Sequence, residues 1–420
     1  MKVTPKDLFL LLVIAALLTS CDKLANSTRS NKFGNIDVNK VLSPNLSDLD
    51  SLGPNVSFQM EINVPGNNEH ELLMSEVIDS VWYVKLGAIP DDLMTGWVRG
   101  LKFHKDRIFM MDGQKNEVFV FGINGDHLYS LNAKGEGPGE FTRASSIAID
   151  PYRDQLVVHD DRLSKLLYYT LQGEFIREHR VAYRFLDFSY INDGMIAVDL
   201  NKTYNDHIPE IRNNQLVLVD TTWKVLAKGG AYNAEKEQKL FYTGDVFTKK
   251  GKQLFYLRPF TYDIYSVDQE RLIPYCRINF GNNNLPEETN FNFSEVKDFW
   301  EEYDDYSYLV GNAHFLNDIT YFEHLYEGRK SSHLFRSNTT GKLYHGQVKN
   351  DIYSLGFFQI SSSIPEKNVL VSYLSSEEVF ANKKLILESD TGSEALRDLV
   401  SVTESTDNPV LIFYKLRTDY

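Results

Sequence analysis

The 420-residue sequence is poor in cysteine, in basic charge and in long hydrophobic runs, and each shortage excludes a class of protein. Two cysteines, Cys21 and Cys276, cannot build a disulfide framework or a cysteine-based zinc site. Lys and Arg number 44 against 58 Asp and Glu, so the net charge is −14 and no nucleic-acid partner is expected. The chain is 42% hydrophobic and 13% aromatic, which excludes a disordered protein and favours strands.

The one long apolar run, Leu8–Leu18, lies at the amino terminus after Lys2 and Lys6. It is too short to span a bilayer and matches the core of a signal peptide. The run ends in Leu18-Thr19-Ser20-Cys21, which resembles the lipobox of bacterial lipoproteins, where the cysteine receives lipid. We therefore predict a signal peptide over residues 1–20, lipid on Cys21 and a membrane-anchored protein at the cell envelope, in a leaflet left open. An ordinary secretory signal with a coincidental cysteine is the alternative.

Residues 21–74 are expected to form a flexible tether. The stretch from Asp22 to Gln59 is rich in Asn, Ser and Asp and has no sustained periodicity. Its removal is therefore expected to cost almost no stability. The remaining residues, 75–420, exceed one ordinary core but fit one large all-β domain.

A four-strand pattern repeats along this domain. The first two units place Phe121 and Tyr169 in equivalent third strands, 48 residues apart. Four short strands repeating every 40 to 50 residues are typical of a β-propeller blade. The strands of these two units are expected at Val98–Phe103, Arg107–Asp112, Glu117–Gly122, His127–Leu131, Ser146–Ile149, Gln155–Asp160, Lys165–Thr170 and Glu174–Val181.

Four further units bring the count to six. The third is assigned at Met195–Asp199, Gln215–Asp220 and Lys224–Lys228, the fourth at Asp245–Thr248, Gln253–Leu257, Tyr262–Val267 and Arg271–Phe280, the fifth at Ile319–His324, Ser332–Ser337 and Lys342–Val348, and the sixth at Phe357–Ser361, Val369–Leu374 and Val410–Leu416. Val81–Leu86 supplies the outer strand that the sixth unit lacks. The sequence thus predicts an all-β, six-bladed β-propeller of four-stranded antiparallel blades, with the ring closed by an N-terminal strand. Helical insertions are expected near 286–312, with Ser294 as a cap, and near 383–401.

A glycine-rich turn separates the first two units. Its residues Gly135, Gly137 and Gly139 tolerate positive φ, Pro138 fixes a bend, and Phe141 offers an aromatic plug between neighbouring sheets. This resembles the linker of NHL-type propellers. Together with the lipobox, the six units and the ending Asn408–Leu416, it makes residues 75–420 similar to the six-bladed β-propeller lipoproteins of the Bacteroides group. The resemblance implies a secreted, surface or periplasmic propeller.

Polar residues in the loops of one face are expected to ring the mouth of the central channel. The candidate ligand-binding residues are Arg99, Arg143, His159, Asp160, Arg258 and His314, with Ser145, Asp161, Arg162 and His324 beside them. Such groups can bind an anionic or sugar-like ligand through charge-assisted hydrogen bonds. Structural roles are the alternative: aspartates at second-strand ends (Asp112, Asp160, Asp199) close turns, and Arg143 and Arg258 form salt bridges between blades.

Catalytic signatures are missing, because no nucleophile-elbow, zincin or EF-hand pattern occurs. No catalytic residue and no cofactor are predicted, although His159-Asp160-Asp161 leaves a divalent metal in the channel as an alternative. Cys276 is interpreted as a small buried residue. We expect a lipid-anchored module that binds a small-molecule, glycan or protein ligand, in glycan or peptide handling. The alternative is a propeller enzyme, a metal-dependent lactonase-like hydrolase or a lyase, with its site at the channel.

Overall fold

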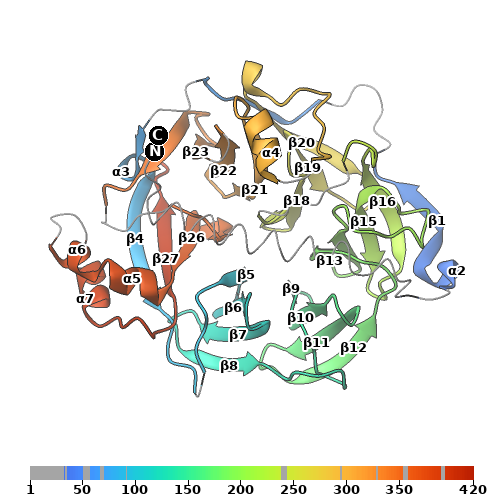
Figure 1. Ribbon diagram of the computed structural model, residues 1–420, viewed down its shortest axis with the longest axis horizontal. Helices are drawn as coiled ribbons and strands as arrows, with labels where there is room; N and C mark the ends of the chain where they lie inside the picture. Colours follow the sequence, from blue (N-terminus) through green and yellow to red (C-terminus); the bar gives the residue numbers. More distant parts are fainter. Residues whose placement is uncertain are drawn as a thin grey trace.

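Six sheets, each built on four antiparallel strands, surround a common axis in the computed structural model (Figure 1), so the prediction of a six-bladed propeller is confirmed. The structure describes residues 33, 36–50, 57–66, 71–90, 92–237, 244–293, 296–327, 330–352, 358–388 and 393–420. The predicted signal peptide, Cys21 and Ser294 lie outside these residues.

Each blade is a meander that runs outward from the axis, and the blades are numbered here from 1 to 6 in chain order. From the innermost strand outward, blade 1 consists of β5 (Val98–His104), β6 (Arg107–Asp112), β7 (Glu117–Gly122) and β8 (His127–Leu131), and blade 2 of β9 (Ser146–Asp150), β10 (Gln155–Asp160), β11 (Lys165–Thr170) and β12 (Phe175–Arg180). Blade 3 consists of β13 (Asp187–Asn192), β14 (Met195–Asp199), β15 (Asn214–Asp220) and β16 (Val225–Ala231), and blade 4 of β17 (Phe247–Lys250), β18 (Gln253–Leu257), β19 (Asp263–Val267) and β20 (Leu272–Asn279). Blade 5 consists of β21 (Tyr308–Phe315), β22 (Ile319–Tyr326), β23 (Lys330–Ser337) and β24 (Leu343–Lys349), and blade 6 of β25 (Ser362–Ile364), β26 (Val369–Leu374), β27 (Val410–Leu416) and β4 (Ile78–Lys85).

The ring closes in blade 6, as the sequence predicts. There β4 from the N-terminal part of the chain pairs antiparallel with β27, from Val410 opposite Lys85 to Leu416 opposite Ile78. The pairing satisfies one edge of β27 while β26 satisfies the other. Blade 6 therefore joins the two ends of the propeller through backbone hydrogen bonds.

The prediction of a flexible tether over residues 21–74 is wrong for the described part of that segment. There β1 (Leu42–Asp48), β2 (Met60–Asn63) and β3 (Glu71–Leu73) add a fifth, outermost strand to blades 3, 4 and 5, each parallel to its neighbour. Residues 42–73 are called the strap below. Buried apolar side chains hold the strap, because Leu42, Leu49, Ile62 and Leu72 pack in the apolar layers of the ring. Removing residues 22–59 would delete Leu42 and Leu49 and expose the apolar side chains of blade 3 and its neighbours on which they pack.

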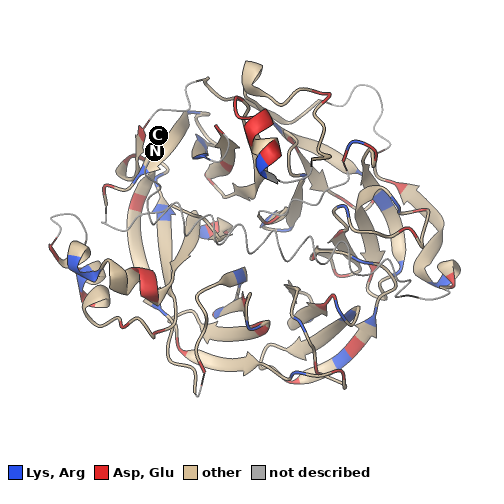
Figure 2. Cartoon of the chain, viewed as in Figure 1, with Lys and Arg blue, Asp and Glu red and all other residues tan. Residues whose placement is uncertain are grey.

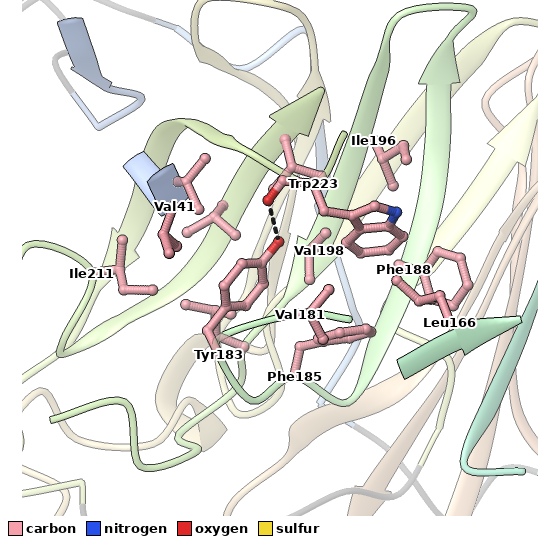
Figure 3. Close-up of a cluster of buried hydrophobic side chains, with 14 of the residues drawn as sticks. Val41, Leu166, Val181, Tyr183, Phe185, Phe188, Ile196, Val198, Ile211 and Trp223 are labelled. Atoms are coloured by element: carbon pink, nitrogen blue, oxygen red, sulfur yellow. Dashed lines mark hydrogen bonds between the residues drawn. The ribbon is translucent and has the colours of Figure 1, made fainter. Parts of the chain in front are cut away.

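The core consists of apolar layers between adjacent sheets. Figure 3 shows the layer between blades 2 and 3, where aromatic side chains pack against Val41, just before the strap. The Tyr183 hydroxyl donates to the Trp223 carbonyl oxygen at 3.2 Å, and Trp223 Nε1 donates to the Tyr168 hydroxyl at 2.6 Å. These bonds satisfy the polar ends of large side chains that would otherwise be costly to bury.

The glycine-rich turn connects blades 1 and 2 and contributes an aromatic side chain to the apolar layer between them. Phe141 is buried in the apolar layer between these blades, and Gly139 has a φ of 74°. A Cβ atom on Gly139 would lie 2.9 Å from the Phe175 ring, so this position excludes other side chains. Buried Cys276 likewise packs in the layer between blades 4 and 5.

Both helical insertions occur in connections between strands of the ring. The short helix α4 (Val296–Glu302) precedes β21, and α5 (Ser376–Ala381), α6 (Lys383–Glu388) and α7 (Glu394–Ser401) join β26 to β27 at the periphery (Figure 1). The expected insertion over 286–312 is too long, since residues 308–312 belong to β21. The remaining helices are α2 (Val38–Val41), α3 (Met74–Val77) and the 3₁₀ turns η1 (Gly281–Asn283) and η2 (Pro365–Lys367). Within the described ranges, no helix has the length and apolarity to cross a membrane.

We expect the strap to contribute measurably to stability. Leu72 in β3 is 0% exposed, whereas its neighbour Leu73 is 37% exposed. Leu72→Ala should lower the free energy of unfolding by about 2–5 kcal/mol, because it leaves a cavity under the strap. Leu73→Ala should change it by less than about 0.5 kcal/mol. Urea unfolding measures both, and equal effects would mean that β3 does not dock on blade 5.

Candidate ligand site at the axis of the ring

Asp160 closes a turn at the end of β10. Its Oδ1 accepts hydrogen bonds from the backbone N–H groups of Arg162 and Leu163, each at 2.9 Å. Its Oδ2 accepts from the Thr142 and Arg143 backbones and from the Thr142 hydroxyl. The carboxylate is completely buried, so this geometry favours the turn-closing role over ligand contact. Asp112 makes equivalent bonds in blade 1.

Two predicted arginines brace neighbouring elements. Arg258 donates to the Ala231 carbonyl oxygen at 3.3 Å and forms an ion pair with Glu237 at 3.4 Å, which ties blade 4 to the connection from blade 3. Arg143 lies 3.7 Å from Asp161 across the loops that flank blade 2. Both side chains are partly buried, and both are already used by partners within the chain.

The predicted histidines separate into two groups. His159 is buried and stacks on Phe185, with ring centroids 3.8 Å apart, between blades 2 and 3. His324 is buried in blade 5, where its Nε2 lies 3.0 Å from that of His345. His314, by contrast, lies on the innermost strand β21 and faces charged groups from other blades.

Arg99 and His314 belong to a set of polar side chains that the six-fold arrangement brings together. The set, called the axial cluster below, comprises Arg99, Lys102, Asp187, Asp245, Lys249, His314 and Ser363, which interact by hydrogen bonds, an ion pair or close electrostatic contact. All seven lie on innermost strands or, for Asp245, two residues before one. Five of the six blades contribute.

An ion pair joins opposite sides of the ring at this cluster. Lys102 of blade 1 contacts Asp245, next to blade 4, with Nζ 2.9 Å from Oδ2. These blades are three positions apart in a ring of six and so face each other across the axis. The two side chains lie deep in the ring yet keep 28% and 29% of their surface exposed. The ion pair is therefore in contact with solvent inside the ring.

Burial sets the charge states around this ion pair. It lowers the pKa of His314 to about 4, so the imidazole is neutral at pH 7, and its Nδ1 hydrogen-bonds the Ser363 hydroxyl at 2.9 Å. Burial also lowers the pKa of Lys249 to about 8, which leaves most of the ammonium charged at pH 7. Burial alone would lower the pKa of Lys102, but Asp245 and Asp187 outweigh this effect and raise it.

Two acidic side chains of blade 3 border the cluster. Asp187 and Asp199 are cross-strand partners on β13 and β14, and both are buried. Burial raises the pKa of Asp187 to about 7, despite Lys102, and that of Asp199 to about 8. The backbone N–H of Asn201 donates to Asp199 Oδ1, and the buried Tyr256 side chain lies beside the same carboxyl group. Asp199 thus closes its turn less completely than Asp112 and Asp160.

At neutral pH the axial cluster carries more positive than negative charge. Within the cluster Arg99, Lys102 and Lys249 supply cations, and Asp245 and a fraction of Asp187 oppose them. Asp150 at the end of β9 adds a further acidic group that acts on Lys249. Around the rest of the ring both signs of charge are distributed over every blade (Figure 2). A desolvated cationic group favours a ligand that carries a carboxylate or another anionic group. No group of three or more His, Cys, Asp or Glu is placed to hold a metal ion within the described ranges.

The sequence pattern does not point to Lys102, Asp187, Asp245, Lys249 or Ser363. It favours loop residues, whereas the cluster is built from the innermost strands. Of these the pattern does not predict β13 and β21, and it places the innermost strand of blade 6 at Phe357–Ser361, whereas β25 spans Ser362–Ile364. The usable signal was a charged residue on the first strand of a unit, such as Lys102 beside apolar Leu101 and Phe103.

Comparisons with known proteins agree with this architecture. A family model described as a domain of unknown function, DUF4934, matches residues 59–415. A Bacteroides fragilis protein described as exported has a similar structure, with a TM-score of 0.70 and 16% identity over 85% of this chain and 99% of that one. A member of the DUF4221 family from Bacteroides vulgatus aligns with a TM-score of 0.50 and 11% identity, over 81% and 97% of the two chains. None of the curated proteins matches the sequence.

The raised pKa of Asp199 predicts a specific pH dependence of stability. The folded pKa, about 8, lies above the unfolded value of 3.8, so Asp199 stabilises the fold fully below pH 3.8 and loses this contribution as the pH rises through 8. Asp199→Asn removes this pH-dependent loss of stability, because asparagine does not ionise. Relative to wild type, the variant should gain about 4 kcal/mol of unfolding free energy between pH 5 and pH 9.

Asp160→Asn is the matched control for that measurement. Its carboxylate accepts five hydrogen bonds, so the substitution should lower stability at both pH values by about 1–3 kcal/mol. Urea unfolding at the two pH values checks both variants. A constant difference between Asp199→Asn and wild type would show that Asp199 is ionised throughout.

Proposed function

The chain belongs to the DUF4934 family, and we propose that it is an exported, lipid-anchored binding module that recognises an anionic ligand at the axis of its ring. The observation that carries this proposal is the partly exposed Lys102–Asp245 ion pair, surrounded by Arg99 and Lys249. A carboxylate of an acidic glycan or peptide is the expected ligand group. It would pair with Lys102 and its neighbours in place of Asp245.

Rigidity supports a binding role for the cluster. Except for Asp245, its side chains project from strands rather than loops, and the strands are fixed by pairing within each blade. Positions on regular elements hold ligand groups with little loss of conformational entropy on binding. The residues that brace the loops, Arg143 and Arg258, keep the surrounding blades in place.

Export and anchoring are the second part of the proposal. The apolar run before Cys21 and the lipobox-like ending support a lipoprotein signal. The structural similarity to an exported Bacteroides protein supports export. Lipid on Cys21 would place the propeller at the cell envelope, because several acyl chains give stable membrane attachment.

An enzymatic role is the second candidate, and one observation favours it. Asp187 and Asp199 are adjacent buried carboxyl groups with pKa values of about 7 and about 8, a range suited to proton transfer near neutral pH. This candidate requires that Asp199 carry a proton near neutral pH, which the pH dependence of unfolding described above also tests. If Asp199→Asn and wild type show the same pH dependence of stability, Asp199 is not protonated and cannot act as a general acid.

Binding at the axis is tested with two matched lysine variants. Lys102→Met should weaken the binding of D-glucuronate or N-acetyl-glutamate by about tenfold or more, because a charged hydrogen bond contributes roughly 1.5–3 kcal/mol. Lys105→Met removes an exposed lysine three residues away, which pairs with Asp154, and should leave affinity unchanged. Isothermal titration calorimetry measures both variants. Equal affinities of Lys102→Met and wild type for every acid that binds would contradict an axial site.

Anchoring is tested with two matched cysteine variants. Cys21→Ala should move the protein from the membrane to the soluble fraction, because it removes the predicted lipid attachment. Cys276→Ala replaces a buried thiol and should leave the protein at the membrane. Fractionation with immunoblotting and mass spectrometry of the amino-terminal peptide provide the readout. An unmodified Cys21 in the membrane-bound protein would refute lipidation.

A further inference from the structure

A second candidate site lies on the outer rim, where blades 5 and 6 meet near the C-terminal end (Figure 1). It is a pocket of about 370 Å³, within the usual range for small-molecule sites, roughly 300–1,000 Å³. Three segments far apart in sequence build it: Glu76 from α3, Lys342 and Tyr344 at the start of β24, and Arg417, Asp419 and Tyr420 after β27. The pocket shares no residue with the axial cluster, so the two sites can be tested independently.

Two tyrosine rings form the apolar part of this pocket. Tyr344 and Tyr420 pack edge to face, with ring centroids 4.7 Å apart and an interplanar angle of 85°. The Tyr420 hydroxyl is shielded from solvent and has no hydrogen-bond partner among the described residues. The rings therefore offer apolar surface, and one buried polar group lacks the partner that such groups usually have.

The charged groups around the rings balance one another. Arg417 donates two hydrogen bonds to Asp419, at 3.1 and 2.9 Å, and Glu76 accepts one from the Leu73 backbone at 2.9 Å. Lys342 donates to the Tyr344 hydroxyl at 2.9 Å and lies 4.8 Å from the centre of the same ring. Two cations and two carboxylates thus line one pocket.

This balance selects against ions and against purely apolar ligands. For an ion of either sign, attraction to two of these groups is offset by repulsion from the other two, and an apolar molecule would leave charged groups without partners. A hydroxyl group suits the pocket, because it both donates to carboxylates and accepts from ammonium and guanidinium groups. A molecule with several hydroxyls and one apolar face would also cover a tyrosine ring.

We propose that this rim pocket binds a neutral sugar ring. The C–H face of the sugar would pack on Tyr344 or Tyr420. Its hydroxyls would bond to Lys342, Arg417 and Glu76. The pocket volume accommodates one or two sugar units, and the open rim lets a longer chain extend into solvent.

The test uses the full-length protein and a defined set of probes. Methyl glucoside, methyl galactoside and N-acetylglucosamine are the neutral sugars, D-glucuronate is the charged analogue and cyclohexanol is the apolar one. In NMR titrations, at least one neutral sugar should saturate wild type with a Kd on the order of 1–10 mM. D-Glucuronate and cyclohexanol should bind this pocket at least about tenfold more weakly.

Variants assign the binding to the rim. Tyr344→Ala and Glu76→Gln should each weaken the binding of the neutral sugar by about tenfold, while Lys102→Met at the axis leaves it unchanged. Glu76→Gln keeps an acceptor for the Leu73 backbone, so it tests the pocket even if Tyr344→Ala unfolds. The proposal is overturned if no neutral sugar saturates below about 100 mM, or if Glu76→Gln and Lys342→Met bind like wild type.

Discussion

The pairing of β4 with β27 is the interaction on which the rest of the molecule depends. Without it, blade 6 would lose its outer strand and the apolar layers on either side of the blade would lose part of one wall. Closure also determines the geometry of the axis, because opposite blades can face each other only in a complete ring. The distance between Lys102 and Asp245 is therefore a consequence of a pairing made at the periphery.

The two candidate sites use charge in different ways. In the axial cluster, groups of both signs are drawn into a buried setting, and burial shifts the pKa values of His314, Lys249 and Asp187 toward neutral forms. At the rim, the charged groups remain at the surface and pair with each other. Charge interactions with a ligand are therefore strong and selective at the axis, whereas at the rim the individual contacts are weaker and their charges offset one another.

Local pattern predicts the blades well, since strands such as β6, β7, β10 and β11 begin and end where the sequence predicts. The alternation of apolar residues and the polar turns is a property of neighbouring residues. The strap and the axial cluster are different, because each depends on contacts between residues distant in sequence. Leu49 stands alone between polar residues, whereas Met60, Ile62 and Val64 alternate with polar residues as in a strand. In both cases the partner surface comes from distant blades, 3 and 4. Lys102 and Asp245 likewise meet only after the ring has closed.

The strap has a consequence for the order in which the chain acquires its structure. Its residues are synthesised before any blade exists, yet its three strands add to blades 3, 4 and 5, so they must dock after those blades have formed. Long-range pairing of this kind is slow. A nascent segment that waits for its partners is at risk of pairing with other chains. The sparse apolar content of the strap reduces that risk, because a few buried residues, such as Leu49 between Asp48 and Asp50, suffice for docking while the polar residues keep the waiting segment in solution.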